Sequence, residues 1–153
     1  MLTSVAIALG SNLGDRRAHL DYSTARLGTL LEHLRVSNYI ETDPVGVPDH
    51  QSPFLNAAAV GQSALSPREL LEALLGIERE RGRTRAFPGA ARTLDLDLVL
   101  FGDQVVNEPG LVVPHPRFRE RWFVLQPLAQ IAPDMRDPVT GRSVQALLEL
   151  VGK

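Results

Sequence analysis

Residues 79–101 read RERGRTRAFPGAARTLDLDLVLF and contain the strand that decides the fold. Their last part, residues 94–101, is an apolar run interrupted only by Asp95 and Asp97. The run is too short for a helix and favours β structure, so it predicts a strand. Because side chains alternate along a strand, Asp95 and Asp97 are expected on one face of a sheet.

Two carboxylates in this arrangement favour a bound cation. At about 6 to 7 Å apart they repel each other by about 2 to 3 kcal/mol at an effective dielectric of about 20. Mg²⁺ is the expected cation, because it prefers oxygen ligands and takes further ligands from water and substrate phosphates. Two other interpretations stay open for the pair: neutralisation by nearby arginines, and simple exposure to solvent.

The segment before this strand is rich in arginine, and its five arginines are Arg79, Arg81, Arg83, Arg85 and Arg92. Arg79 and Arg81 are expected to end a helix that stops at Gly82, since cations are favourable near a helix C-terminus. The other three fall in a segment without periodicity. A guanidinium group binds phosphate oxygens bidentately, so these three are candidate phosphate ligands.

The composition fits one domain over residues 1–153, since 44% of the residues are hydrophobic and the length allows a core. The chain has no cysteine, which excludes disulfides, thiolate catalysis and zinc-thiolate sites. Its only lysine is Lys153, which excludes a P-loop lysine and a Schiff-base lysine. The N-terminal residues lack a basic leader and a long apolar run, so we expect a cytoplasmic protein without a membrane segment.

The remaining sequence alternates predicted strands and helices. Strands are predicted at 4–9, 36–42, 54–62 and 94–101, and helices at 15–34, 66–81, 119–130 and 143–150. Asn12 or Asp15 is expected to cap the first helix, Ser66 and Pro67 to begin the second, and Val105 with Val106 to form a short hairpin arm.

The order β-α-β-β-α-β predicts an α+β, ferredoxin-like core. In this arrangement an antiparallel sheet carries helices on one face, and the C-terminal helices are additions to it. Substrates are expected on the open face of the sheet. Residues 43–53 and 83–92 are expected to act as lids that are less ordered than the sheet in the absence of ligand.

Short motifs spread in order over nearly the whole chain resemble the 6-hydroxymethyl-7,8-dihydropterin pyrophosphokinase family. They are ALGSNLGD at 8–15, ETDPVG at 41–46, FLNAA at 54–58, GRTR at 82–85, RTLDLDLVLFG at 92–102 and VPHP at 113–116. The resemblance implies transfer of the β,γ-diphosphate of ATP to the hydroxymethyl group of the pterin, giving AMP and the pterin diphosphate for folate synthesis. It also implies two Mg²⁺ ions, ATP as co-substrate and a monomeric protein.

The resemblance further implies roles for individual residues. Asp95 and Asp97 would bridge the two Mg²⁺ ions, and Arg83, Arg85 and Arg92 would close on the phosphates as catalytic residues. The expected nucleotide contacts are these three arginines with Glu78, Leu98, His115 and Arg121. The expected pterin contacts are Thr42, Pro44, Val45, Phe54, Asn56, Asp95 and Phe123.

Several of these residues have a plainer alternative role. His115 is compatible with an ordinary surface or capping histidine, and Glu78 with an exposed carboxylate at a helix end. Phe54 and Phe123 would by default be core aromatics. The resemblance instead favours Phe123 as the ring that stacks on the pterin and Phe54 as a wall of its pocket.

The chain departs from the family pattern at residues 87–91. The family usually has a basic residue, often a tryptophan, and a Gly-Pro-Arg run shortly before the two aspartates, whereas this chain has FPGAA. Gly110 and Pro116 also stand where some relatives carry longer side chains that touch the nucleotide. These departures bear on the affinity for ATP more than on the identity of the reaction.

Two other classes of protein compete with this interpretation. A metal-dependent nuclease or phosphohydrolase could use the same carboxylates, but the sequence has no further Asp, Glu or His cluster dense enough for a hydrolytic two-metal cage. A ferredoxin-like RNA-binding module needs exposed aromatics on its central strands and a basic face. AIAL at 6–9 and NAAAV at 56–60 carry no rings, and the net charge is -2. We therefore expect small-molecule partners and no nucleic acid.

Overall fold

A computed structural model of the chain describes residues 1–42, 53–82 and 93–152. Apart from Pro53, the two segments expected to act as lids lie outside these residues. The expectation that they are less ordered than the sheet therefore stays a prediction.

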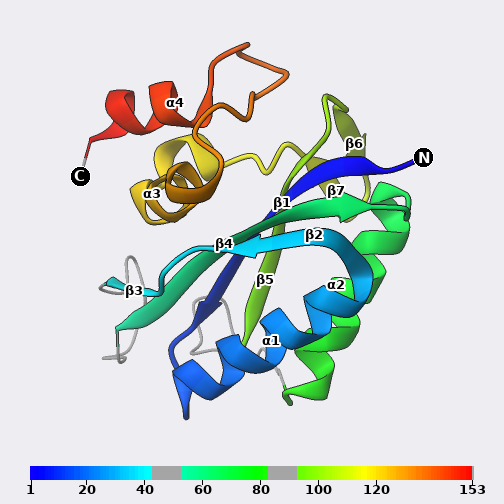
Figure 1. The fold of residues 1–153 in the computed structure, drawn as a ribbon, viewed down its shortest axis with the longest axis vertical. Helices are drawn as coiled ribbons and strands as arrows, with labels where there is room; N and C mark the ends of the chain where they lie inside the picture. The colour runs from blue at the N-terminus through cyan, green and yellow to red at the C-terminus, as the bar shows by residue number, and fades with distance from the viewer. Residues whose placement is uncertain (43–52, 83–92, 153) are drawn as a thin grey trace.

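An antiparallel sheet forms the centre of the fold (Figure 1). Its strands are β1 (Thr3–Ser11), β2 (Leu31–Val36), β3 (Ile40–Thr42), β4 (Phe54–Ser63) and β5 (Asp95–Phe101). The strand order is β2-β4-β1-β5, and β3 pairs with the first residues of β4. The strand predicted at 94–101 is thus confirmed, and among the described strands it lies at an edge of the sheet.

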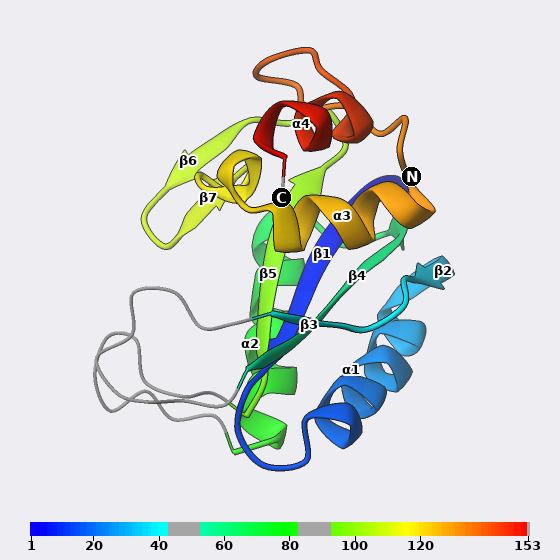
Figure 2. The same cartoon turned by 90° about the vertical axis from the view of Figure 1, so that its left-hand side faces the viewer.

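Helices cover both faces of this sheet. On one face lie α1 (Arg16–Leu30) and α2 (Pro67–Glu80), which confirms the predicted α+β, ferredoxin-like core. The chain continues from β5 into a hairpin of β6 (Val106–Glu108) and β7 (Leu111–Val113), then into η1 (Phe118–Glu120), α3 (Trp122–Ile131) and α4 (Val144–Val151). Figure 2 shows α3 crossing one end of the sheet on the opposite face. The predicted C-terminal additions therefore cover part of the face that was expected to be open.

Alternation along the strands explains the two layers of core. Val5, Ile7 and Leu9 of β1 belong to the cluster beneath α1 and α2, whereas Ala6 and Ala8 belong to the cluster beneath α3 and α4. Strand β4 behaves in the same way, since its residues also alternate between the two clusters. On the α3 side, β1 therefore contributes only the small side chains of Ala6 and Ala8 to the core.

The helix starts follow from local sequence. Ser66 caps α2 in a capping box, in which Ser66 Oγ accepts from the Glu69 N–H and the Glu69 carboxylate accepts from the Ser66 N–H. Pro67 then occupies the first turn, as predicted. Asp15 caps α1, because its Oδ1 accepts from the Ala18 N–H at 3.1 Å, so of the two predicted caps Asp15 is confirmed.

The boundary after α1 was predicted wrongly. Helix α1 ends at Leu30, and residues 31–34 belong to β2, where Leu31 pairs with Ser63 and Glu32 with Gln62 of β4. The leucine spacing continues a helical pattern past this point, but pairing with β4 prevails over it. The register shifts between Glu32 and Arg35, where His33 has a φ of 55°.

Two other predicted elements are split. The strand expected at 36–42 is interrupted between Val36 and Ile40, where Ser37 binds Ala58 through both its N–H and its side chain. The helix expected at 119–130 is a short 3-10 turn that ends at Glu120, followed by α3 from Trp122. In the described part of the chain, no helix has both the length and the apolar character needed to cross a membrane.

Candidate active site

The two aspartates of β5 lie on the sheet face that α3 partly covers. Leu96 and Leu98 point into the core beneath α1 and α2, so alternation places the side chains of Asp95 and Asp97 on the other face. Both aspartates are half-buried. The residue that faces Asp95 on β1 is Gly10, and Ala8 faces Asp97.

The donor set at these aspartates suits Mg²⁺. Among the described residues, no group of three or more His, Cys, Asp or Glu side chains could hold a metal ion by itself. Two carboxylates on one face therefore leave most coordination positions to water and phosphate oxygens, which is the usual way proteins hold Mg²⁺ with a nucleotide.

A row of three residues that includes Asp95 crosses the sheet. Gly10 pairs with Asn56 on one side and with Asp95 on the other, so the three residues lie side by side on β4, β1 and β5. Alternation along β4 places the Asn56 side chain on the same face as the aspartates. Asn56 Nδ2 donates to Thr42 Oγ1 at 2.6 Å, and both residues are buried.

Gly10 lies among the candidate site residues, although the sequence alone did not single it out. A Cβ added at Gly10 would lie 3.2 Å from Asn56 Oδ1 and 3.6 Å from Phe54 Cδ1. Gly10 therefore forms a flat floor between Asn56, Phe54 and Asp95. The glycine stands in ALGSN at 8–12, but only the strand register reveals which side chains surround it.

His115 is held against the same strand. Its N–H donates to the Val99 carbonyl oxygen at 3.0 Å, and its Nδ1 accepts from the Arg117 N–H at 3.1 Å. Burial lowers the pKa of His115 below its ordinary value, the charge of Arg121 lowers it further, and the charge of Asp95 opposes both. With Nδ1 accepting a hydrogen bond, the neutral ring carries its proton on Nε2 and offers it as a donor. Half burial sets aside the ordinary surface residue, whereas the bond from the Arg117 N–H is compatible with the capping alternative.

Arg121 and Phe123 stand together at the start of α3. Arg121 Cζ lies 5.8 Å from the centroid of the Phe123 ring, and Phe123 is half-buried against the core beneath α3. The rings of Trp122 and Phe123 form a T-shaped pair with centroids 6.4 Å apart. Phe54, at the start of β4, is half-buried as well.

The other predicted site residues are placed less directly. Glu78 is only 3% exposed and its Oε2 accepts from the Leu96 N–H at 2.7 Å, so the alternative of an exposed carboxylate is wrong. Leu98 is 5% exposed with its side chain in the core beneath α1 and α2, which leaves any contact with a nucleotide to its main chain. The predicted residues that lie outside the described part of the chain are Pro44, Val45, Arg83, Arg85 and Arg92.

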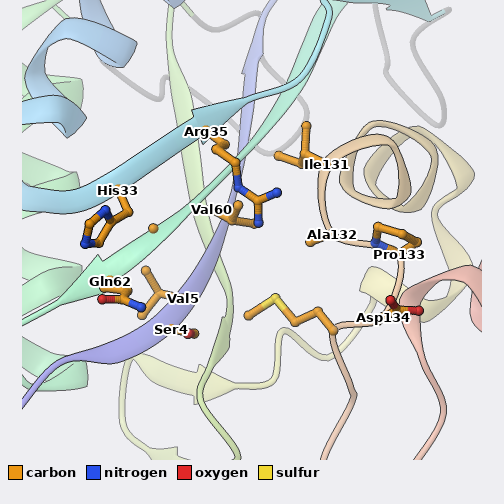
Figure 3. Close-up of a pocket in the computed structure, with 12 residues that line it drawn as sticks. Ser4, Val5, His33, Arg35, Val60, Gln62, Ile131, Ala132, Pro133 and Asp134 are labelled. Carbon is orange, nitrogen blue, oxygen red and sulfur yellow. The ribbon is translucent and has the colours of Figure 1, made fainter.

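A separate cavity of about 420 Å³ lies at the far ends of β1 and β4, away from Gly10 and Asn56. It lies between Gln62 of β4 and the residues that follow α3 (Figure 3). Arg35 extends over this cavity, whereas His33 and Asp134 lie at opposite sides of it. Its ionisable side chains therefore do not converge on one point. The candidate site residues Gly10, Asn56 and Asp95 lie at the other end of the sheet.

Comparison with known proteins gives one consistent result. The family model for 7,8-dihydro-6-hydroxymethylpterin-pyrophosphokinase (HPPK) matches residues 6–133. The chain is 46% identical over 136 residues to the 2-amino-4-hydroxy-6-hydroxymethyldihydropteridine pyrophosphokinase of Bacillus subtilis, an alignment that covers 88% of this chain and 81% of the relative. It is 43% identical over 150 residues to the protein of the same name from Pseudomonas aeruginosa, with 97% and 91% covered.

The fold is also found in solved structures. The wild-type HPPK-DHPS of Plasmodium falciparum superposes with a TM-score of 0.76 at 14% identity, over 98% of this chain and 45% of that chain. The present chain thus spans less than half the length of that larger protein, and the likeness concerns the fold alone.

Proposed function

The chain belongs to the 7,8-dihydro-6-hydroxymethylpterin-pyrophosphokinase family, and from this premise we propose how its own residues carry out the reaction. The protein is a pyrophosphokinase of folate biosynthesis that uses ATP as co-substrate. In the proposed reaction the hydroxymethyl oxygen of 6-hydroxymethyl-7,8-dihydropterin forms a bond to the β-phosphorus of ATP. The bond from that phosphorus to the α,β-bridging oxygen breaks, AMP leaves with this oxygen, and the hydroxyl proton passes to solvent.

The row formed by Asn56, Gly10 and Asp95 is the observation that best supports this reaction. A flat ring lying on Gly10 would donate an N–H of its amide-like edge to Asn56 Oδ1 and would reach Asp95 at its other end. This pose directs the hydroxymethyl group toward the pair of carboxylates on β5. Positioning of the nucleophile in line with the phosphorus supplies much of the rate in phosphoryl transfer.

Asp95 and Asp97 are proposed to hold two Mg²⁺ ions together with the triphosphate. When bound, the ions would neutralise charge on the phosphate oxygens and lower the barrier to attack by the hydroxyl group. The carboxylates supply two fixed negative charges on one face of a rigid strand, which orients whatever cation binds there.

Positive and hydrogen-bonding groups are proposed to surround the phosphates. Arg121 and the Nε2–H of His115 would donate to phosphate oxygens from the α3 side of the site. Arg83, Arg85 and Arg92, which precede β5 in the sequence, would close on the same oxygens. The main chain of Leu98 would touch the nucleotide.

The pterin is proposed to lie between aromatic rings. Phe123 would stack on one face of the pterin ring, with Phe54 as a wall. Thr42 fixes the Asn56 amide, and Pro44 and Val45 would line the same pocket. We also propose that one domain, acting as a monomer, contains the complete site.

An assay of AMP formation tests the proposal. Purified protein is incubated with ATP, Mg²⁺ and the pterin, and AMP is measured with pterin-free and EDTA controls. Asp97→Asn is expected to lower turnover about 100-fold or more while the affinity for pterin changes little, because it removes a metal ligand and leaves the pterin pocket intact. Asp103→Asn, an exposed aspartate in the turn after β5, is the matched control. ATP hydrolysis without pterin would indicate a phosphohydrolase instead, and a folded wild-type protein that forms no AMP would refute the proposal.

A further inference from the structure

Glu78 is a buried carboxylate that contacts the main chain between the two candidate metal ligands. It lies in the last turn of α2 and is 3% exposed. Its Oε2 accepts from the Leu96 N–H at 2.7 Å, and Leu96 stands between Asp95 and Asp97. The carboxylate thus approaches β5 from α2.

The geometry of the sheet explains why this N–H needs a partner. In an antiparallel pair, neighbouring residues alternate between pointing their N–H and C=O groups toward the partner strand and away from it. Because the Leu96 N–H is bonded to Glu78, it points away from β1, and the main-chain groups of Asp95 and Asp97 point toward β1. At the edge of the described sheet, no other strand faces Leu96, and Glu78 supplies the acceptor.

The bond also limits what else this carboxylate can do. One of its oxygens is engaged by the main chain of β5, and little of its surface reaches solvent. A nucleotide contact through Glu78 would have to reach the other oxygen of a side chain that is only 3% exposed. Burial of a carboxylate without such a bond would cost free energy, so the hydrogen bond from Leu96 offsets part of the cost of burying Glu78.

We propose that Glu78 is a positioning residue, which fixes the main chain between Asp95 and Asp97 and so keeps the two carboxylates at one separation and direction for Mg²⁺. It acts through the strand and does not touch ATP. This inference rests on the proposed metal-binding role of the two aspartates.

Two substitutions separate this role from a nucleotide contact. Glu78→Gln keeps the size of the side chain and an oxygen that accepts from Leu96, so it is expected to keep turnover within about threefold of the wild type. Glu78→Leu keeps the approximate volume but has no acceptor. It is expected to lower kcat about tenfold and to raise the Mg²⁺ concentration needed for half-maximal rate, with KM for ATP at saturating Mg²⁺ little changed. Glu72→Leu, at an exposed position of the same helix, is the control.

Hydrogen exchange at the Leu96 amide gives a readout that does not depend on activity. The amide should be protected in the wild type and in Glu78→Gln, and should exchange faster in Glu78→Leu while the amides of β1 and β4 keep their protection. Unchanged exchange at Leu96 in Glu78→Leu would overturn the inference, whether or not the wild type forms AMP.

The kinetic results also distinguish a nucleotide-binding role of Glu78 from a positioning role. If both variants raise KM for ATP to the same extent and leave the Mg²⁺ requirement unchanged, Glu78 binds the nucleotide and the inference is wrong. If the wild type forms no AMP, the proposed function has failed, and the loss of protection at Leu96 alone then decides whether Glu78 fixes the strand.

Discussion

The side chains of Asn56 and Thr42 are joined by a hydrogen bond of 2.6 Å, in which Asn56 Nδ2 donates to Thr42 Oγ1. The bond crosses from β4 to β3 and fixes the plane of the amide. With Nδ2 engaged in this way, Asn56 Oδ1 is the atom nearest to a Cβ built on Gly10. The short strand β3 therefore determines which atom of Asn56 is presented to the floor of the site.

Substitution of Thr42 tests this relationship. Thr42→Val keeps the shape of the side chain but removes the acceptor, so the Asn56 amide is free to rotate. We expect KM for the pterin to rise about three- to tenfold, the range that one neutral hydrogen bond provides, while KM for ATP stays unchanged. Thr42→Ser keeps the acceptor and should behave like the wild type. Steady-state kinetics with each substrate varied would show the split, and equal changes in both KM values would contradict it.

A methyl group at Gly10 should obstruct the site without unfolding the protein. In Gly10→Ala the new Cβ would lie 3.2 Å from Asn56 Oδ1, close enough to displace the amide and to raise the floor beneath the ring. We expect KM for the pterin to rise about tenfold, as for overpacking of a fitted site, with little change in KM for ATP.

Gly28→Ala is the matched control for that variant. Its Cβ would lie 3.9 Å from Leu34 Cδ2, an ordinary contact, on the exposed side of α1. It should leave the kinetics unchanged and raise the free energy of unfolding by about 0.5 to 1 kcal/mol, because alanine favours a helix more than glycine does. Pterin binding by Gly10→Ala equal to that of Gly28→Ala would show that Gly10 is no part of the site.

The pKa of His115 reports on the charges around it. Burial and Arg121 lower this pKa and Asp95 raises it, so the ring should titrate below its ordinary 6.5 in the ligand-free protein. Since protonation is disfavoured in the folded state, this histidine should begin to reduce the free energy of unfolding as the pH falls below 6.5.

Two variants give opposite shifts of that titration. Arg121→Gln should raise the pKa of His115, and Asp95→Asn should lower it further. NMR of the His115 ring protons over a pH series would measure both shifts. Shifts in the same direction in both variants would show that His115 does not lie between these two charges.

Asp137 should be a main contributor to stability in the C-terminal region. Its carboxylate accepts from Arg119 Nε at 2.5 Å and Nη2 at 2.9 Å, from the Thr140 hydroxyl and from the Val139 N–H. Asp137→Asn removes the charge from a fully buried position, and we expect the free energy of unfolding to fall by about 3 kcal/mol at pH 7. Asp134→Asn, at an exposed neighbouring position, should change it little.

The same substitution has a predictable pH dependence. Burial alone would raise the pKa of Asp137, but the hydrogen bonds from Arg119 and its neighbours prevail and lower it below the ordinary 3.8. The stabilisation is therefore fully present above pH 3.8 and is lost as the pH falls through and below this value. Urea unfolding at a series of pH values should show the difference between wild type and Asp137→Asn shrinking below pH 4. A difference that stays constant would contradict the assignment.

Local sequence predicted those features of the fold and site that depend on alternation and on capping residues. The shared face of Asp95 and Asp97 follows from strand geometry, and the start of α2 follows from Ser66 and Pro67. The end of α1 could not be predicted in this way, because the apolar spacing runs on from Leu27 to Leu34 and only pairing with β4 decides where the helix stops. Local sequence patterns are sufficient to predict an element whose bounds do not depend on pairing with a distant segment.

The missed site features depend on which segments meet in space. Gly10 lies between Asn56 and Asp95 because of the register of three strands that are distant in sequence. Glu78 is buried because the end of α2 packs against the edge of β5, which nothing within residues 66–81 reveals. Register and edge contacts are properties of the assembled sheet, so a single sequence gives little information about them.

The alanines beneath α3 have a consequence for how related proteins can diverge. Ala6, Ala8 and Ala58 separate this helix from the sheet, and the start of the helix carries Arg121 and Phe123. Larger side chains in that layer would push α3 away from the sheet and would move Arg121 and Phe123 with it. If the pterin stacks on Phe123 as proposed, residues that touch no ligand thus help to set where its ring can lie.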